Sequence, residues 1–331
     1  MTYAVLRAGL VGLGMMGRNH ARVLASLDGV KLVGIADPQP GPHQAAAGAP
    51  VVPSVEELIA LGLDYCVVAA PTAAHESVGT ALAEAGVHAL IEKPLAPDSQ
   101  AARRLVKLFE DRGLIGGVGH IERFNPALAN MRRRLDHGEL GEVFQVVTRR
   151  QGPFPTRIAD VGVVMDLATH DIDLTTWVTR RGYETVAAHT AHRSGREHED
   201  LVAVVGGLEG GAVASHLVNW LSPMKERVTV VTGERGCFAA DTLTADLTYY
   251  ANSSVPTEWE ALQNFRGVTQ GDIVRFAIAK PEPLRTEHEA FRDAVRGLDA
   301  PIVTFEEGVR TVRTAEALLR SSICGQRVAV D

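Results

Sequence analysis

Cysteine is scarce in this chain, and its distribution excludes two classes of protein. The 331 residues contain three cysteines, Cys66, Cys237 and Cys324, and none of them forms a C-x-x-C pair. A disulfide framework needs an even and denser set of cysteines, and a thiolate zinc site needs closely spaced pairs. We therefore expect neither, and we assign Cys66, which lies in an apolar run, to the core.

Long apolar runs and an excess of positive charge are also lacking. No run is long enough to span a bilayer, and the formal net charge of −7 argues against nucleic acid or an anionic membrane as the main partner. A strand-like run begins within the first few residues, which leaves no space for a secretory signal peptide. We predict a cytoplasmic protein that acts on a small molecule.

The first third of the chain alternates strand-like and helix-like patterns, and Ser54 is a predicted helix N-cap. This alternation predicts βαβ units and a parallel sheet that is covered on both faces. The predicted strands are residues 6–14, 30–38, 63–71, 87–94 and 114–122, and the predicted helices are residues 15–27, 54–62, 75–86 and 99–113.

The pattern changes near residue 121. Two predicted helices, 125–138 and 165–178, are followed by β-like runs with glycine-rich turns, and the tail returns to helix. Strands without intervening helices indicate an antiparallel sheet. We predict an α/β Rossmann domain over residues 1–121 and, over residues 122–331, an α+β domain with a large, mostly antiparallel, open-faced sheet.

Three glycines follow the first predicted strand and open the first predicted helix: Gly12, Gly14 and Gly17. This spacing permits a tight turn and a close approach of the backbone to a pyrophosphate, whose charge the helix N-terminus stabilises. Asp37 ends the second predicted strand, where a carboxylate can hydrogen-bond the adenosine ribose and would repel a 2′-phosphate. The sequence predicts dinucleotide binding and favours NAD over NADP.

Two further predicted strands end in residues suited to a ligand site, Pro71-Thr72 and Glu92-Lys93-Pro94. A lysine at this edge of a parallel sheet can stabilise a developing alkoxide, and an exposed loop lysine is the plain alternative. His75 begins the next predicted helix, as a cap or as a contact of the nicotinamide half. The predicted cofactor contacts are Gly12, Gly14, Met15, Met16, Gly17, Asp37, Pro71, Thr72, His75, Glu92 and Lys93.

An aspartate–histidine pair interrupts the apolar segment "GVVMDLATHDIDL". Asp166 and His170 are four residues apart, and Asp173 lies about one turn further, so a helix would present all three on one face. The residues alone leave two interpretations open. Asp166 and His170 either carry chemistry, or they form a structural pair on a partly buried helix with Asp171 and Asp173 in solvent.

The glycine motif, Asp37, "EKP", "GHIERFNP" and "DLATHDID" together resemble the Gfo/Idh/MocA family of NAD(P)-dependent sugar and cyclitol dehydrogenases. The resemblance implies that Lys93, Asp166 and His170 are catalytic. His170 would be the general base that takes the proton of a sugar hydroxyl as hydride leaves its carbon. Asp166 would orient or stabilise this charge, and Lys93 would stabilise the developing alkoxide.

Two stretches, "GHIERFNPAL" and "NWLSPMKERVTVV", resemble a subgroup of the UDP-N-acetylglucosamine 3-dehydrogenase type. Its diphosphate could be bound by Arg150, Arg157, Lys225 and Arg227, or most of these residues could form surface ion pairs. The chain departs from this subgroup at Thr242, where an aromatic residue is expected. The predicted substrate contacts are Lys93, His120, Arg123, Asn125, Arg150, Arg157, Asp166, His170 and Lys225, with Arg227 as a further candidate.

We therefore predict an NAD-dependent dehydrogenase that oxidises a secondary sugar hydroxyl, at C3 of a UDP-N-acetylhexosamine, or that catalyses the reverse reduction. The alternatives are an inositol or free-sugar dehydrogenase and a non-catalytic regulator that senses NAD or sugar. An open sheet face would need covering, which predicts a homodimer or homotetramer. His189, His192 and His198 lack a supporting carboxylate spacing, so we predict no metal site.

Overall fold

The chain folds into two compact units. The structure is a computed structural model that describes residues 3–39, 46–154, 161–253 and 269–330. The first unit comprises Met1–Ile121 and Pro281–Arg313, and the second comprises Glu122–Lys280 and Thr314–Asp331. In the described ranges, no helix is both long enough and apolar enough to cross a membrane.

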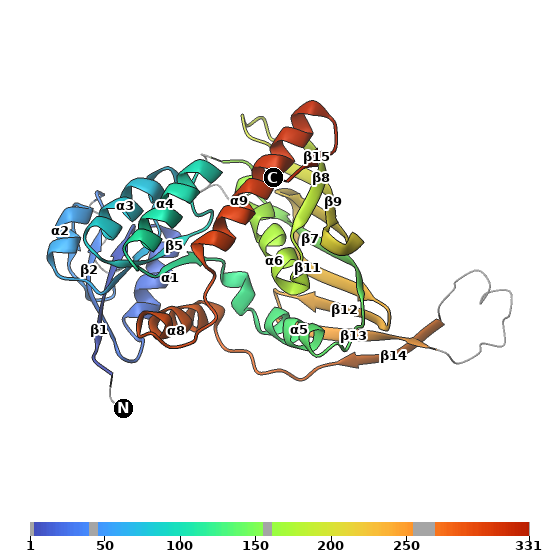
Figure 1. The fold of residues 1–331 in the computed structure, drawn as a ribbon, viewed down its shortest axis with the longest axis horizontal. Helices are drawn as coiled ribbons and strands as arrows, with labels where there is room; N and C mark the ends of the chain where they lie inside the picture. Colours follow the sequence, from blue (N-terminus) through green and yellow to red (C-terminus); the bar gives the residue numbers. More distant parts are fainter. Residues whose placement is uncertain (1–2, 40–45, 155–160, 254–268, 331) are drawn as a thin grey trace. The chain divides into compact units, whose positions relative to one another are not determined.

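A parallel sheet of six strands forms the centre of the first unit (Figure 1). All of its neighbouring strands run parallel, and their order is β3-β2-β1-β4-β5-β6. The central strand β4 is buried along its whole length. This is expected for a parallel sheet that is covered on both faces. The strands are β1 (Leu6–Val11), β2 (Val30–Ala36), β3 (Val51–Val52), β4 (Tyr65–Val68), β5 (His88–Glu92) and β6 (Gly116–Gly119).

Helices connect these strands, as the alternating pattern predicts. The predicted N-cap is confirmed, because the Ser54 hydroxyl accepts a hydrogen bond from the main-chain N–H of Glu57 (3.2 Å). Cys66 is fully buried in β4, as predicted. The helices are α1 (Met15–Leu24), α2 (Val55–Ala60), α3 (His75–Glu84) and α4 (Ser99–Asp111), and a short 3₁₀ turn, η2 (Thr72–Ala74), precedes α3.

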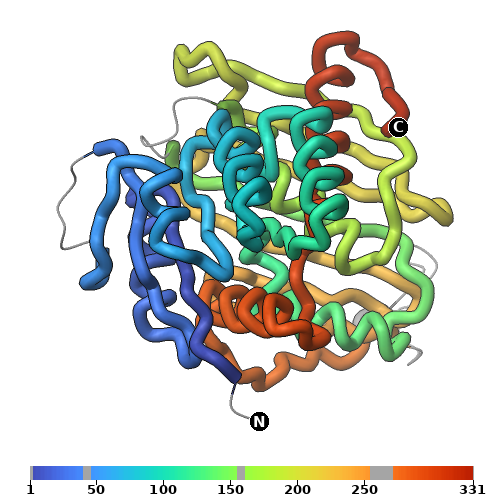
Figure 2. The backbone as a smooth tube through the Cα atoms, turned by 60° about the vertical axis from the view of Figure 1, so that its left-hand side comes forward, coloured from blue at the N-terminus to red at the C-terminus, as the bar shows by residue number. Residues whose placement is uncertain are grey.

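The predicted domain boundary needs a correction, because residues 281–313 belong to the first unit. This segment contains α8 (Pro283–Val295), which packs beside α1 (Figure 2). Phe291 of α8 meets the ring of Tyr65 edge-on at 5.6 Å, and Phe305 meets Phe109 at 4.8 Å. These apolar contacts join segments far apart in sequence, and so a boundary read along the chain misses them.

A nine-stranded sheet forms the second unit, in the order β14-β13-β12-β11-β7-β10-β9-β8-β15. Every neighbouring pair is antiparallel except β7 and β10, which confirms the predicted fold class. The strands are β7 (Val143–Pro153), β8 (Tyr183–Ala191), β9 (Leu201–Leu208), β10 (Val213–Asn219), β11 (Leu221–Gly233), β12 (Gly236–Asp241), β13 (Asp246–Ser253), β14 (Thr269–Arg275) and β15 (Val328–Ala329).

Helices cover one face of this sheet, and the described part of the chain places none on the other (Figure 1). The covering helices are α5 (Pro126–Asp136), α6 (Thr169–Thr179) and the second half of α9 (Phe305–Cys324), with short 3₁₀ turns at η3 (Ile121–Phe124) and η5 (Glu209–Gly211). On the opposite face, Val205 of β9 and Val213 and Leu217 of β10 are exposed. We call these three residues the open-face valine–leucine patch.

Candidate functional site

The predicted cofactor residues gather at one edge of the first sheet. Gly12 follows β1, Asp37 follows β2, Thr72 lies shortly after β4, and Lys93 follows β5. Because these strands are parallel, their carboxyl ends share an edge, and the strand order reverses beside β1. Ligands of open α/β sheets bind at such a reversal point.

The glycine turn leaves space where a pyrophosphate would lie. Gly12 has a φ of +91°, and a Cβ there would lie 2.6 Å from the Ala69 carbonyl oxygen. A Cβ on Gly17 would lie 2.0 Å from the Gly12 carbonyl oxygen, so this helix–strand contact requires glycine. By contrast, a Cβ on Gly14, the N-cap of α1, would meet no atom within 4 Å. An open cradle at a helix N-terminus fits a dinucleotide phosphate.

Asp37 is held close to this turn. One carboxylate oxygen accepts a hydrogen bond from the Leu13 N–H (2.6 Å), and the other accepts one from the Gln39 N–H (2.8 Å). Two backbone donors fix the orientation of the carboxylate at the end of β2. Its contact with a ribose remains a prediction.

The His75 ring is buried and lies between two main-chain carbonyl groups, while its contact with the nicotinamide half stays a prediction. The side chain is 1% exposed, Nδ1 lies 2.9 Å from the Pro94 carbonyl oxygen, and Nε2 lies 3.0 Å from the Ala70 carbonyl oxygen. Burial lowers the pKa of His75, although hydrogen bonds to these carbonyls oppose the shift. The ring joins the segments after β4 and β5 and is turned into the unit.

The main chain at Lys93 is bonded to the buried carboxylate of Glu92. Its main-chain N–H donates to Oε2 of Glu92 (3.1 Å), and Oε1 of Glu92 lies 2.9 Å from Nε2 of His20. Sequence reasoning missed His20, which lies one turn after Gly17 on α1. The sequence does show a histidine among apolar residues on one face of α1, the face that also carries the buried Ala21 and Leu24. A polar residue on an apolar helix face could have marked this position.

The prediction of one regular helix through Asp166 and His170 is only partly right, because the segment divides into two parts. Residues Val164–Ala168 form a π-helical turn, and α6 follows from Thr169. The Thr169 N–H reaches the Val164 carbonyl, five residues back, and its hydroxyl donates to the Met165 carbonyl (3.0 Å). Such single π turns occur often at functional sites.

Asp173 forms a buried, two-pronged ion pair with Arg123. Nε of Arg123 donates to Oδ2 at 2.8 Å, and Nη2 donates to Oδ1 at 2.5 Å. The Asp173 side chain is 1% exposed. Arg123, which was predicted to contact substrate, is therefore paired with a carboxylate of its own unit. The interpretation that places Asp173 in solvent is wrong.

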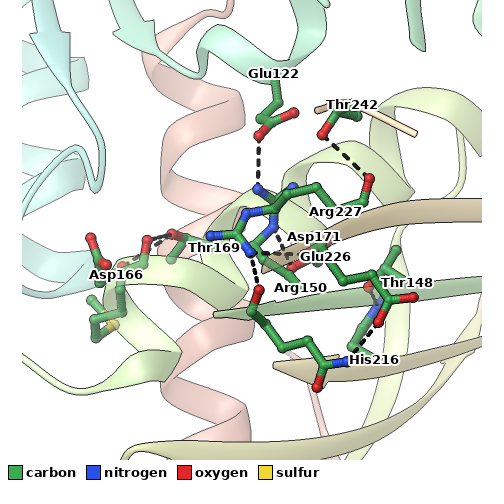
Figure 3. A network of polar contacts seen from close by, with 12 residues as sticks. Glu122, Thr148, Arg150, Asp166, Thr169, Asp171, His216, Glu226, Arg227 and Thr242 are labelled. Carbon is green, nitrogen blue, oxygen red and sulfur yellow. Dashed lines mark hydrogen bonds and ion pairs between the residues drawn. The ribbon is translucent and has the colours of Figure 1, made fainter. Parts of the chain in front are cut away.

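Arg150 joins two further carboxylates on the covered face of the second sheet (Figure 3). Nε donates to Asp171 (2.9 Å) and Nη1 donates to Glu122 (2.7 Å). Burial disfavours the charge, but the two carboxylates outweigh it and raise the pKa of Arg150. Asp171 is therefore buried and paired, and the interpretation that places it in solvent is wrong.

Arg227 of β11 lies opposite Arg150 in the register of the sheet. Its Nη1 donates to the carbonyl oxygens of Gln151 (2.7 Å) and Glu226 (2.8 Å). Burial, and then the neighbouring charge of Arg150, lower the pKa of Arg227. Lys225, two residues earlier, is exposed.

The remaining predicted substrate residues have varied surroundings. Asn125 caps α5 through the Ala127 N–H (3.0 Å) and donates to the Thr242 carbonyl (3.0 Å). His120 is buried, and Arg157 lies outside the described residues. Among those that are described, no group of three or more His, Cys, Asp or Glu side chains is placed to hold a metal ion.

Sequence comparison identifies the family. Residues 6–120 match the description "Oxidoreductase family, NAD-binding Rossmann fold", and residues 128–239 match "GFO/IDH/MocA C-terminal domain". These matches cover more than half of the chain, and the chain belongs to the Gfo/Idh/MocA oxidoreductase family.

Two curated relatives differ in their substrates. UDP-N-acetylglucosamine 3-dehydrogenase of Acidithiobacillus ferrooxidans is 34% identical over 178 residues, which is 53% of this chain and 54% of that protein. Myo-inositol dehydrogenase Hyg17 of Streptomyces leeuwenhoekii is 38% identical over 209 residues, 61% of this chain and 62% of that protein. The matched region thus spans less than two thirds of either relative.

Solved structures share the fold over nearly the whole chain. The Acidithiobacillus enzyme, GnnA, has a TM-score of 0.83 and 26% identity, over 96% of this chain and 97% of that chain. The WlbA dehydrogenase of Bordetella pertussis, in complex with NADH and UDP-GlcNAcA, has a TM-score of 0.79 and 25% identity, over 98% of each chain.

The Arg150 ion pairs predict a large cost for a single truncation. Asp171→Ala leaves a buried guanidinium with one carboxylate fewer, and we expect the free energy of unfolding to fall by about 3–5 kcal/mol. Urea denaturation measures this change. Asp111→Ala removes an exposed partner of Lys107 and should have a much smaller effect. Equal effects of the two variants would contradict the structural role of Asp171.

Proposed function

We propose that the protein is an NAD-dependent dehydrogenase that oxidises a secondary hydroxyl of a nucleotide-linked amino sugar, C3 of a UDP-N-acetylhexosamine, to a ketone, or that reduces the ketone. The observation that carries this proposal is the open glycine cradle at Gly14, on the same sheet edge as Lys93. Similarity to GnnA and WlbA supports the sugar-nucleotide class.

The chemistry divides among three side chains. When bound, NAD supplies the acceptor for the hydride that leaves the sugar carbon. His170 takes the hydroxyl proton, a role that suits an imidazole near neutral pH. Lys93 stabilises the oxygen as it gains negative charge, and Asp166 orients or charge-stabilises His170. The products are the ketone, the reduced cofactor and a protonated His170.

The candidates for binding the diphosphate are now fewer. Arg150 is engaged in buried pairs with two carboxylates, so its charge is already balanced within the second unit. Arg157 lies outside the described residues. Lys225 is exposed, and Arg227 is held by two main-chain carbonyls through one nitrogen only. We therefore assign the diphosphate to Lys225 and Arg227.

A parallel assay tests the substrate class. We expect NADH formation with UDP-N-acetylglucosamine or UDP-N-acetylglucosaminuronate, and little with N-acetylglucosamine or myo-inositol, measured by absorbance. Turnover with inositol would favour the second candidate, which the 38% identity to Hyg17 supports. Binding of NADH without any turnover would instead favour a sensor.

Substitution of the catalytic candidates should separate binding from chemistry. We expect Lys93→Ala and His170→Ala to keep NADH affinity within a few-fold and to lower kcat by about 10²–10⁴-fold, because each removes a contribution to the transition state. Fluorescence titration and steady-state kinetics measure the two quantities. Wild-type turnover in either variant would remove that residue from the mechanism.

The open-face valine–leucine patch supports a homodimer or homotetramer. Val205, Val213 and Leu217 are 56%, 42% and 37% exposed on adjacent strands, and exposed apolar patches often mark interfaces. Sedimentation should detect an oligomer at micromolar concentration, and Leu217→Glu should shift it toward monomer. Leu298→Glu, at an exposed position in the first unit, is the control. A monomeric wild type would refute this proposal.

A further inference from the structure

A buried chain of polar side chains begins beside Lys93 in the first unit. Glu92 accepts the Lys93 N–H through Oε2 and meets Nε2 of His20 through Oε1 (2.9 Å). The other ring nitrogen of His20 lies 2.9 Å from Nε2 of His288. We call Glu92, His20 and His288 the Glu92 network.

The Glu92 network connects three elements that are distant in sequence. Glu92 ends β5, His20 lies on α1, and His288 lies on α8. Both histidines are fully buried, and Glu92 is 9% exposed. Buried polar groups are costly unless they bond one another, so the three side chains hold one another in place. The network thereby ties the end of β5 to the helix that carries the glycine turn.

Glu92 is the anion of this cluster. Burial favours its neutral form, but the hydrogen bond with His20 and the charges of His20 and Lys93 outweigh burial and lower the pKa of Glu92. An ionised carboxylate only accepts hydrogen bonds, so His20 donates from Nε2. Burial lowers the pKa of His288, and burial together with the charge of Glu92 raises the pKa of Glu287, so the surroundings favour the neutral form of each.

We propose that the Glu92 network positions Lys93 for catalysis, with His20 as its central positioning residue. This inference rests on the proposed function, which gives Lys93 the task of stabilising the alkoxide. Glu92 holds the main chain at Lys93 with one oxygen and is itself held by His20 with the other. A misplacement of about 1 Å at a reacting centre can cost about 100-fold in rate, so a fixed carboxylate beside this lysine has a direct effect on turnover.

Two substitutions of His20 distinguish positioning from packing. His20→Leu removes the donor to Glu92, and we expect kcat to fall about 10- to 100-fold while KM for the sugar and the Kd of NADH stay within about three-fold. His20→Gln restores an amide N–H that can reach Glu92 and should recover most of kcat. The control is His88→Leu, at the other end of β5, where Nδ1 accepts the Ile115 N–H (2.9 Å); its kcat should stay within about two-fold.

A second readout needs neither cofactor nor turnover. Acetylation of the cofactor-free protein, followed by peptide mass spectrometry, compares Lys93 with the exposed Lys107. In His20→Leu the carboxylate that accepts the Lys93 main-chain N–H is no longer fixed. The Lys93 side chain is then less confined, and its acetylation should be several-fold faster, with Lys107 unchanged.

The outcomes separate this inference from the proposed function. The positioning role is refuted if the wild type turns over a substrate and His20→Leu keeps the same kcat. It is also refuted if His20→Leu lowers only the melting temperature and the affinity for NADH. If the wild type turns over nothing, the proposed function fails. The Lys93 acetylation rate then still decides the network, because an unchanged rate in His20→Leu refutes it.

Discussion

The orientation of the candidate chemistry in the second unit depends on two buried arginine–aspartate pairs. Asp171 and Asp173 are two residues apart on α6, so their side chains leave the helix about 200° apart. Arg150 holds the first from β7, and Arg123 holds the second from the turn before α5. Because an unpaired buried charge costs several kcal/mol, α6 cannot rotate about its axis without breaking a pair. The direction of His170, immediately before Asp171, is set by this constraint.

The same pairs limit what the basic residues can do. From the sequence, Arg150 was as eligible for a diphosphate as Lys225, since both are cations in or beside predicted strands. Burial separates them, because a buried guanidinium needs a carboxylate in the folded protein, whether or not a ligand is present. Arginine at such a position holds a helix on the sheet, and only exposed or half-buried cations are left as candidates for binding a substrate.

The parts of the fold that could be predicted are those with local causes. The strands and helices of the first unit follow from runs and periodicities within single segments, and the shared edge of Gly12, Asp37 and Lys93 follows from the parallel order of their strands. The return of α8 to the first unit could not be predicted this way. It depends on the contact of Phe291 with Tyr65, more than two hundred residues away.

The partners of the buried charges could not be predicted either, because they too lie far away in the sequence. These pairs follow the same arrangement in both units. Glu92 directly precedes Lys93, and Asp171 directly follows His170; each neighbour is an acidic residue, buried and bonded to a basic side chain of another element. In each case the main chain beside a candidate catalytic residue is fixed through the carboxylate of its neighbour. The sequence shows the acidic neighbours, but their partners, His20 and Arg150, lie 72 and 21 residues away and are identified only when the chain has folded.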